Sequence, residues 1–166
     1  MSERLWAPWR MDFIRQAEKP EGCVLCGYVG REVGRASRVL VRQEHAYVVL
    51  NKYPYAAGHL MVVPNRHTAS PSELAPEEHD ALWRLVTESA ARLQTASGAE
   101  GLNVGMNLGR AAGAGIHEHL HVHLVPRWSG DNNFMPVIAD VRVMPEYLER
   151  TWEELLPHFA GAEEAR

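Results

Sequence analysis

Apolar and polar positions follow a pattern along this chain that predicts a sheet. Residues 37–42 and 46–50 are β-branched runs separated by three polar residues, which predicts a hairpin with a short turn. A third apolar run covers 59–63 and stops at a proline, and two more cover 102–108 and 119–125. The pattern therefore predicts five strands.

Two other segments have the period of a helix. From Pro76, the acidic Glu77 and Glu78 make a favourable first turn, and apolar residues recur along one side until Gly98. Residues 145–159 predict a second, shorter helix near the C-terminal end. Strands with one long helix among them favour an antiparallel α+β fold, in which that helix covers one face of the sheet.

Length and composition favour one domain over 1–166. A chain of 166 residues, 46% of them hydrophobic, can bury roughly 70% of its unfolded surface in a single core. No repeat or Ser/Gly linker divides the sequence. We predict an N-terminal segment over 1–30, a core of sheet and helix over 37–128, and a C-terminal loop and helix over 129–166.

The charge of the chain limits its partners. The formal net charge is -4, so the sequence predicts no basic surface for long nucleic acid and favours a small ligand. The sequence shows neither a positively charged leader with an apolar core nor an apolar run of about 18 residues, the length of a membrane helix. We therefore expect a cytoplasmic protein with no membrane partner.

Four histidines fall on every second residue of one apolar run: His117, His119, His121 and His123. Successive side chains of a strand point to opposite faces, so this spacing predicts four imidazoles on one face, with apolar residues between them pointing into the core. Histidine titrates near neutral pH and can act as a nucleophile, an acid or base, or a metal ligand. The row therefore needs a chemical explanation.

Three interpretations fit this row: a solvated strand face, a catalytic transition-metal site, and covalent catalysis on phosphorus. A solvated face explains one or two histidines better than four. Alternate residues of a strand lie about 6.6 Å apart, so one metal ion can bind two neighbours but hardly three. In covalent catalysis, one neutral imidazole attacks phosphorus while its neighbours donate hydrogen bonds to phosphoryl oxygens. We favour this third interpretation.

The loop over 109–115 comes just before these histidines and contains only Gly, Ala and Arg110. The backbone amides of such small residues can approach an anion closely, as they do in phosphate-binding loops. Taken alone, the loop is explained equally well as a plain connection. Its place before the histidines favours phosphate binding.

The heptapeptide HLHVHLV at 119–125 resembles the signature of the histidine triad (HIT) superfamily, His-φ-His-φ-His-φ-φ with φ apolar, at every position. Further segments resemble the branch that includes bacterial diadenosine tetraphosphate phosphorylases and hydrolases. In chain order they are 5–11, 50–55, 58–64, 103–109, 125–128 and 130–134. The resemblance covers most of the chain and implies a HIT-like α+β fold and a homodimer.

The resemblance also implies roles for individual side chains. The middle histidine of the triad, His121, would be the nucleophile that attacks the α-phosphorus and forms a nucleotidyl-histidine intermediate. His123 would bind the α-phosphate and assist the leaving group, and His59 would be a further active-site histidine. The predicted nucleotide-binding residues, including two loop glycines, are Asn51, Asn107, Gly113, Gly115, His121 and His123. For the two asparagines, a turn cap and a strand-end side chain remain alternative explanations.

The leading hypothesis is therefore an enzyme, a nucleotidyl transferase or hydrolase that cleaves at the α-phosphate of an adenine nucleotide such as diadenosine tetraphosphate. The alternative is a nucleotide-binding regulatory or scaffold protein with little turnover. The intact set of His119, His121 and His123 favours the enzyme, because binding alone does not need an unprotonated nucleophile. No organic cofactor is expected.

Both cysteines of the chain lie in one motif, Cys23-x-x-Cys26. Such a pair can be half of a tetrahedral zinc site, a redox pair, or two unliganded thiols. Some HIT proteins have a tetrahedral zinc site of this kind. The resemblance to them implies a structural zinc held by Cys23, Cys26, His67 and His119. His45 is a competing ligand for the place of His67. His117 stands where related sequences often have proline, and no role is predicted for it.

Overall fold

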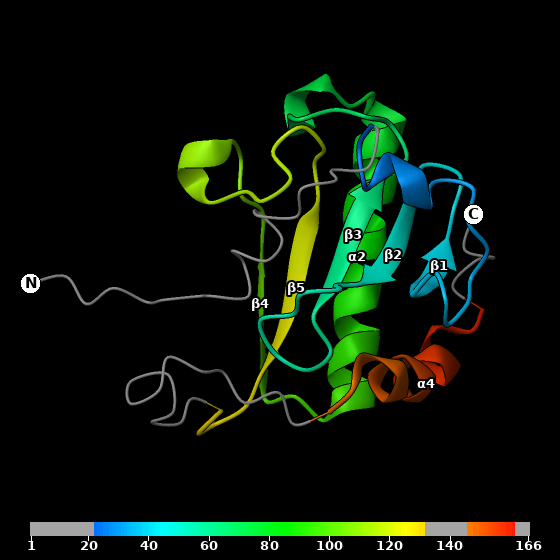
Figure 1. Cartoon of the computed structure of the whole chain (residues 1–166), viewed down its shortest axis with the longest axis vertical. Coiled ribbons are helices and arrows are strands. Elements are labelled where there is room, and N and C mark those ends of the chain that lie inside the picture. The colour runs from blue at the N-terminus through cyan, green and yellow to red at the C-terminus, as the bar shows by residue number, and fades with distance from the viewer. Residues whose placement is uncertain (1–21, 132–145, 162–166) are drawn as a thin grey trace, which may run out of the picture.

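A five-stranded antiparallel sheet forms the centre of the molecule (Figure 1), in the order β1-β2-β3-β5-β4. The computed structural model describes residues 22–131 and 146–161. The strands are β1 (Val39–Arg42), β2 (Ala46–Leu50), β3 (Leu60–Pro64), β4 (Gly101–Gly105) and β5 (Val122–Arg127). The predicted α+β class and five strands are confirmed.

Two α-helices accompany the sheet, α2 (Pro76–Ser97) and α4 (Leu148–Phe159). The Glu78 carboxylate accepts a hydrogen bond of 2.9 Å from the backbone N–H of Ala75 at the start of α2, and Gly98 ends the helix in a left-handed conformation at φ 61°. The described residues also form three short 3-10 helices. They are η1 (Cys26–Tyr28), η2 (Pro71–Glu73) and η3 (Arg110–Ala112).

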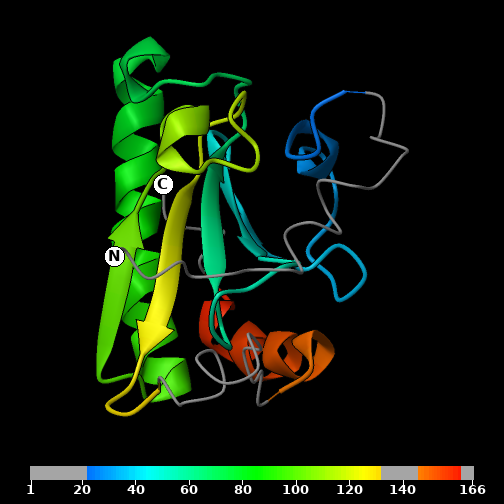
Figure 2. The same cartoon turned by 60° about the vertical axis from the view of Figure 1, so that its left-hand side comes forward.

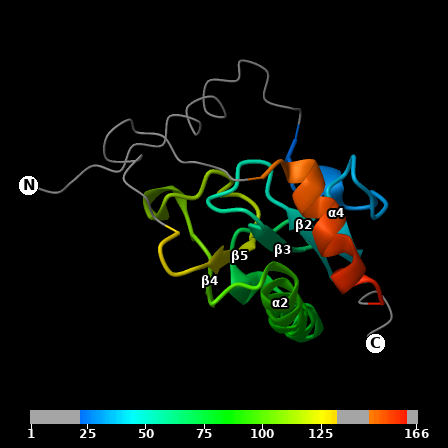
Figure 3. The same ribbon diagram turned by 90° about the horizontal axis from the view of Figure 1, so that it is seen from below.

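Helix α2 covers one face of the sheet, and α4 lies beside α2 and β1 (Figure 3). The apolar side of α2 packs against β2, β3 and β5 in the main core. Trp152 of α4 belongs to this core, and its ring N–H donates to the backbone oxygen of Val39 at 3.3 Å. No helix among the described residues combines the length and apolar character that a membrane crossing needs.

The opposite face of the sheet is covered over β1, β2 and β3 by the segment 23–34 (Figure 2). Leu25 and Tyr28 pack there in a second buried cluster with Tyr47 and Met61 of the strands. The hydroxyl of Tyr47 donates to the backbone oxygen of Leu25 at 2.7 Å. On the same face, a cavity lined by His123, Asn103 and Arg127 lies over β5 and β4.

The strand ends that differ most from the prediction are the start of β5 and the end of β4. β5 begins at Val122, three residues after His119, because the backbone N–H of Leu120 bonds to Thr68 O at 2.6 Å and not to a strand. β4 ends at Gly105, so 106–108 lie outside the sheet. The side chains still alternate: Leu120, Val122 and Leu124 belong to the main core under α2, and the histidines between them face the other way.

Candidate active site and metal site

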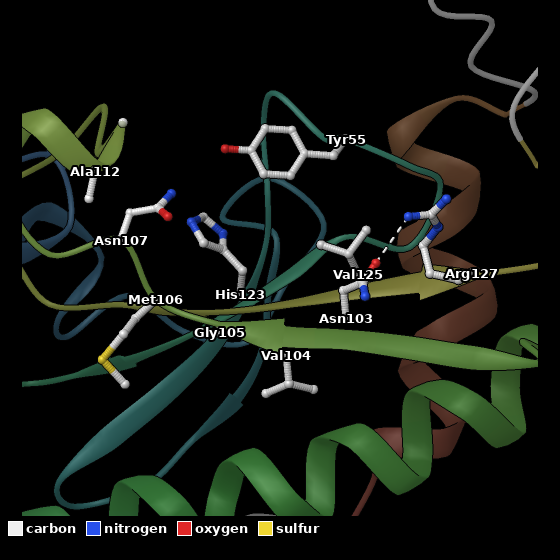
Figure 4. A pocket seen from close by; sticks show the side chains of 11 residues that line it. Tyr55, Asn103, Val104, Gly105, Met106, Asn107, Ala112, His123, Val125 and Arg127 are labelled. Atoms are coloured by element: carbon white, nitrogen blue, oxygen red, sulfur yellow. Dashed lines mark hydrogen bonds between the residues drawn. The ribbon is translucent and has the colours of Figure 1, made fainter.

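Two neighbouring cavities share His123, and Figure 4 shows the larger of them. The small cavity, of about 100 Å³, is lined by Asn51, Tyr53, Met61, Gly115, Ile116 and His121. The large one, of about 510 Å³, is lined by Asn103, Val104, Gly105, Met106, Ala112, Gly113, Val125 and Arg127. Both are lined by Tyr55, Asn107 and His123, so these three side chains form the boundary between them.

His59 lies directly before β3 and is fully buried. Its Nδ1 accepts a hydrogen bond of 3.0 Å from the backbone N–H of Tyr55. Because a backbone N–H can only donate, the neutral ring carries its proton on Nε2, which lies 2.9 Å from His123 Nδ1. His59 therefore donates to His123, and the proton of a neutral His123 is on Nε2.

The tautomer of His121 is the opposite of that of His59. Its Nδ1 donates to the backbone oxygen of His119 at 2.9 Å, since a carbonyl oxygen can only accept. Burial lowers the pKa of His121, so the ring is neutral at pH 7 and its Nε2 has no proton. The ring lies edge-on to His123, with the ring centroids 4.8 Å apart. An unprotonated imidazole nitrogen and an imidazole N–H donor thus lie side by side.

Burial also keeps His59 neutral. Burial and, less strongly, charge repulsion from the neighbouring His123 and His121 together lower the pKa of His59 to about 3. The ring of Tyr55 lies 4.6 Å from that of His59 and 5.7 Å from that of His123, centroid to centroid. The aromatic ring therefore packs against both imidazoles.

A second cluster contains Cys23, Cys26, His67 and His119, whose ligand atoms all lie within 4.8 Å of one another. His119 Nδ1 is 3.4 Å from both sulfur atoms, and Cys26 Sγ is 3.2 Å from His67 Nδ1. His119 Nε2 donates to Pro64 O at 2.9 Å, so its unprotonated Nδ1 faces the sulfurs. The four atoms are arranged as possible ligands of one metal ion.

The chemistry of this cluster fits a tetrahedral cation. Bonds of about 2.3 Å to sulfur and about 2.0 Å to nitrogen place such ligands roughly 3.6 Å apart in a tetrahedron, close to the distances seen here. Burial raises the pKa of Cys26, and the nearby Cys23 raises it further. Two adjacent thiolates are therefore unfavourable without a cation between them. His45 lies outside the cluster, and His67 occupies the fourth position.

Comparison with known proteins agrees with this architecture. The model of the HIT domain matches residues 34–130. The chain belongs to the HIT family. Over 165 residues it is 37% identical to an AP-4-A phosphorylase of Mycobacterium tuberculosis strain H37Rv, and the match covers 95% of this chain and 85% of that protein.

Two solved HIT structures extend the comparison. A hypothetical histidine triad nucleotide-binding protein from Sulfolobus tokodaii has a TM-score of 0.67 at 28% identity, covering 82% of this chain and 91% of its own. A Zn-bound histidine triad family protein from Mycobacterium smegmatis has a TM-score of 0.66 at 25% identity, covering 87% of this chain and 98% of its own.

The other predicted residues lie around the two cavities. Asn51 lines the small cavity, and its Oδ1 accepts the backbone N–H of Tyr53 at 2.9 Å, so it also caps the turn. Asn107 lines both cavities, whereas Gly115 lines the small one and Gly113 the large one. His117 lines neither, and its Nε2 accepts from Arg110 Nε at 3.1 Å. The row of four imidazoles is thus divided among three environments.

Sequence reasoning missed Tyr55, Asn103 and Arg127. All three lie in segments that resemble the diadenosine tetraphosphate branch, but the resemblance assigned them no role. Arg127 lies four positions after His123 on the same strand, so the strand period places both side chains on one face. That periodicity is the signal that could have added Arg127 to the site.

Proposed function

We propose that this HIT protein cleaves a dinucleoside polyphosphate, such as diadenosine tetraphosphate, at an α-phosphate and transfers the nucleotidyl group to inorganic phosphate or water. The observation that carries the proposal is the unprotonated Nε2 of His121 in a cavity shared with His123. A regulatory protein that only binds nucleotides would not need this arrangement. The similarity to an AP-4-A phosphorylase supports the choice of substrate.

In the first step, the lone pair of His121 Nε2 forms a bond to the α-phosphorus. The bond from that phosphorus to the bridging oxygen breaks, and its electron pair stays on the oxygen of the leaving polyphosphate. His123 Nε2 donates a hydrogen bond to the charge that develops there. His59 fixes the tautomer of His123 and keeps this donor in place.

In the second step, an oxygen of inorganic phosphate attacks the nucleotidyl-histidine. The N–P bond breaks and its electrons return to Nε2 of His121, which regenerates the neutral ring. From diadenosine tetraphosphate, the leaving group is ATP and the product of phosphate attack is ADP. Attack by water would give AMP instead, with a proton released to solvent.

The test is to incubate the protein with diadenosine tetraphosphate, with and without labelled inorganic phosphate. ATP together with labelled ADP is expected for a phosphorylase, and ATP together with AMP for a hydrolase. Mass spectrometry of the quenched protein should find an adenylyl group on the peptide that contains His121. Nucleotide binding without ATP release from any dinucleotide would favour the regulatory alternative.

Zinc is the metal that we assign to Cys23, Cys26, His67 and His119. Two sulfurs and two imidazole nitrogens suit zinc, and four protein ligands leave no open position for chemistry. The ion would supply structure by joining the N-terminal segment to the residues before β5. Thiolate ligands also require reduced cysteines, which agrees with a cytoplasmic location. Metal analysis of the purified protein should find one zinc per chain.

We further propose that the chain forms a homodimer through β4. This strand is at the edge of the sheet, and Val104 is 45% exposed there, with Leu108 47% exposed just beyond it. Light scattering should give about twice the 18.6 kDa mass of the chain. Val104→Lys should shift the protein toward the monomer, and a monomeric wild-type protein would contradict the proposal.

A further inference from the structure

The two cavities differ in which histidines they contain. His121 lines only the small cavity, whereas His123 lines both, so the large cavity begins on the far side of His123 from the attacking ring. In phosphoryl transfer, the attacking and leaving atoms lie roughly in line on opposite sides of the phosphorus. A nucleotide attacked by His121 would therefore release its leaving group into the large cavity.

The large cavity follows β5 and β4 from His123 to Arg127 (Figure 4). These two residues are four positions apart on one strand, which separates them by about 13 Å. The Arg127 guanidinium is bonded to Asn103, which pairs with Val125 of β5, so it lies farther along the strand than His123. This position corresponds to the more distant part of a leaving nucleotide that extends from His123.

Arg127 is held in a defined orientation at that end. Its Nη1 donates to Asn103 Oδ1 at 3.0 Å, and its Nε and Nη2 donate to the Asp131 carboxylate at 2.5 and 2.8 Å. Within residues 22–131 and 146–161, these bonds use three of the five guanidinium N–H groups, and one N–H is left on each Nη atom. Two N–H groups on a fixed planar fork match the oxygens of a phosphate group.

We propose that Arg127, oriented by Asn103 and Asp131, binds the distal phosphate of the leaving nucleotide and so determines leaving-group specificity. The ligand is a nucleoside polyphosphate in the large cavity, next to the nucleotide that is transferred. The proposal rests on the nucleotidyl transfer proposed above. If the proposal holds, a substrate with a long polyphosphate leaving group is better than one with a short leaving group, because only the long group reaches Arg127.

The test compares two substrates in Arg127→Met, which keeps an unbranched side chain and removes the guanidinium. Diadenosine tetraphosphate has a long leaving group, and adenosine 5′-phosphoramidate has only an amine in its place. We expect kcat/KM for the tetraphosphate to fall about 10- to 100-fold and that for the phosphoramidate to change less than about threefold. Product inhibition by ATP should weaken by a factor similar to the first.

Arg84→Met is the matched control, because Arg84 is exposed on α2, which covers the other face of the sheet. It removes the same charge from the chain and should leave the ratio of the two kcat/KM values unchanged. The phosphoramidate rate also reports how much of each variant is folded and active. Light scattering checks that Arg127→Met keeps the oligomeric state of the wild type.

Three outcomes would count against the inference, and they have different meanings. An equal loss on both substrates would show that Arg127 supports the structure only, and no loss on either would show that the leaving group does not reach it. Both outcomes overturn the inference and leave the proposed nucleotidyl transfer intact. A wild-type protein that cleaves neither substrate overturns the proposed function, and the inference with it.

Discussion

His119 and His121 are two residues apart, yet they belong to two different sites. Each ring donates one N–H to a backbone oxygen at 2.9 Å, His119 to Pro64 O and His121 to His119 O. His119 donates through Nε2 and keeps Nδ1 as its acceptor, whereas His121 donates through Nδ1 and keeps Nε2. The backbone carbonyl that each ring bonds to thus decides which of its nitrogens is left to face the two thiols or the small cavity.

The two sites are also joined through the backbone. The carbonyl that holds the proton of His121 belongs to His119, whose ring lies in the Cys/His cluster. A metal ion bound there would fix the His119 ring and, with it, the orientation of that carbonyl. We therefore expect the cluster to influence the nucleophile by positioning it, without taking part in the attack.

The largest expected effect separates the attacking histidine from its neighbours. His121→Asn keeps a polar side chain but removes the nucleophile, so turnover of diadenosine tetraphosphate should fall by at least about 10⁴-fold. Binding of a non-cleavable analogue, measured by calorimetry, should change by less than about tenfold. Turnover close to the wild-type rate would show that another group attacks the phosphorus.

The next effect concerns the metal site and uses two histidines as a matched pair. His67→Ala removes a proposed ligand and should abolish stoichiometric zinc, whereas His45→Ala should retain it. Loss of the ion should lower the free energy of unfolding by about 3 kcal/mol, or roughly 6–12 °C in Tm. The loss of kcat should be far smaller than in His121→Asn, because the cluster only positions the nucleophile.

Zinc measured by mass spectrometry under native conditions decides between the two ligands. If zinc survives His67→Ala and is lost in His45→Ala, the ligand set is wrong. If chelation abolishes kcat as completely as His121→Asn while the protein stays folded, the metal takes part in the chemistry and the contrast between the two sites fails.

The sequence was sufficient for much of the fold, and physical reasons explain where it was not. Local signals such as the strand alternation, Pro76 and Gly98 identified the elements. The tautomers of His119 and His59 depend on Pro64 O and on the Tyr55 N–H, which come from other parts of the chain, so no pattern in the histidine run reveals them. The start of β5 depends in the same way on Thr68 O.

A smaller effect concerns His59, the buried histidine beside His121 and His123. The pKa of His59 is about 3 in the folded protein and about 6.5 when unfolded, so between these values the unfolded chain binds the extra proton. The free energy of unfolding should therefore fall as pH decreases from about 6.5 toward 3, by up to about 1.4 kcal/mol per pH unit from this group.

His59→Asn should remove this part of the slope, which urea denaturation at several pH values will measure. Equal slopes in wild type and His59→Asn would show that His59 becomes protonated in the folded protein, and the fixed tautomer of His123 would lose its basis.

The smallest expected effect tests whether Asn51 serves the cavity or only its own turn. Asn51→Ala removes the acceptor of the Tyr53 N–H and should destabilise the protein by about 1 kcal/mol. If Asn51 also binds the ribose, KM for diadenosine tetraphosphate should rise roughly tenfold, which corresponds to one lost hydrogen bond. Asn51→Asp keeps an oxygen for the turn, so its stability should remain within about 0.5 kcal/mol of the wild type. A loss of stability in Asn51→Ala with an unchanged KM would assign this residue to the turn alone and leave recognition of the nucleotide to the other residues that line the small cavity.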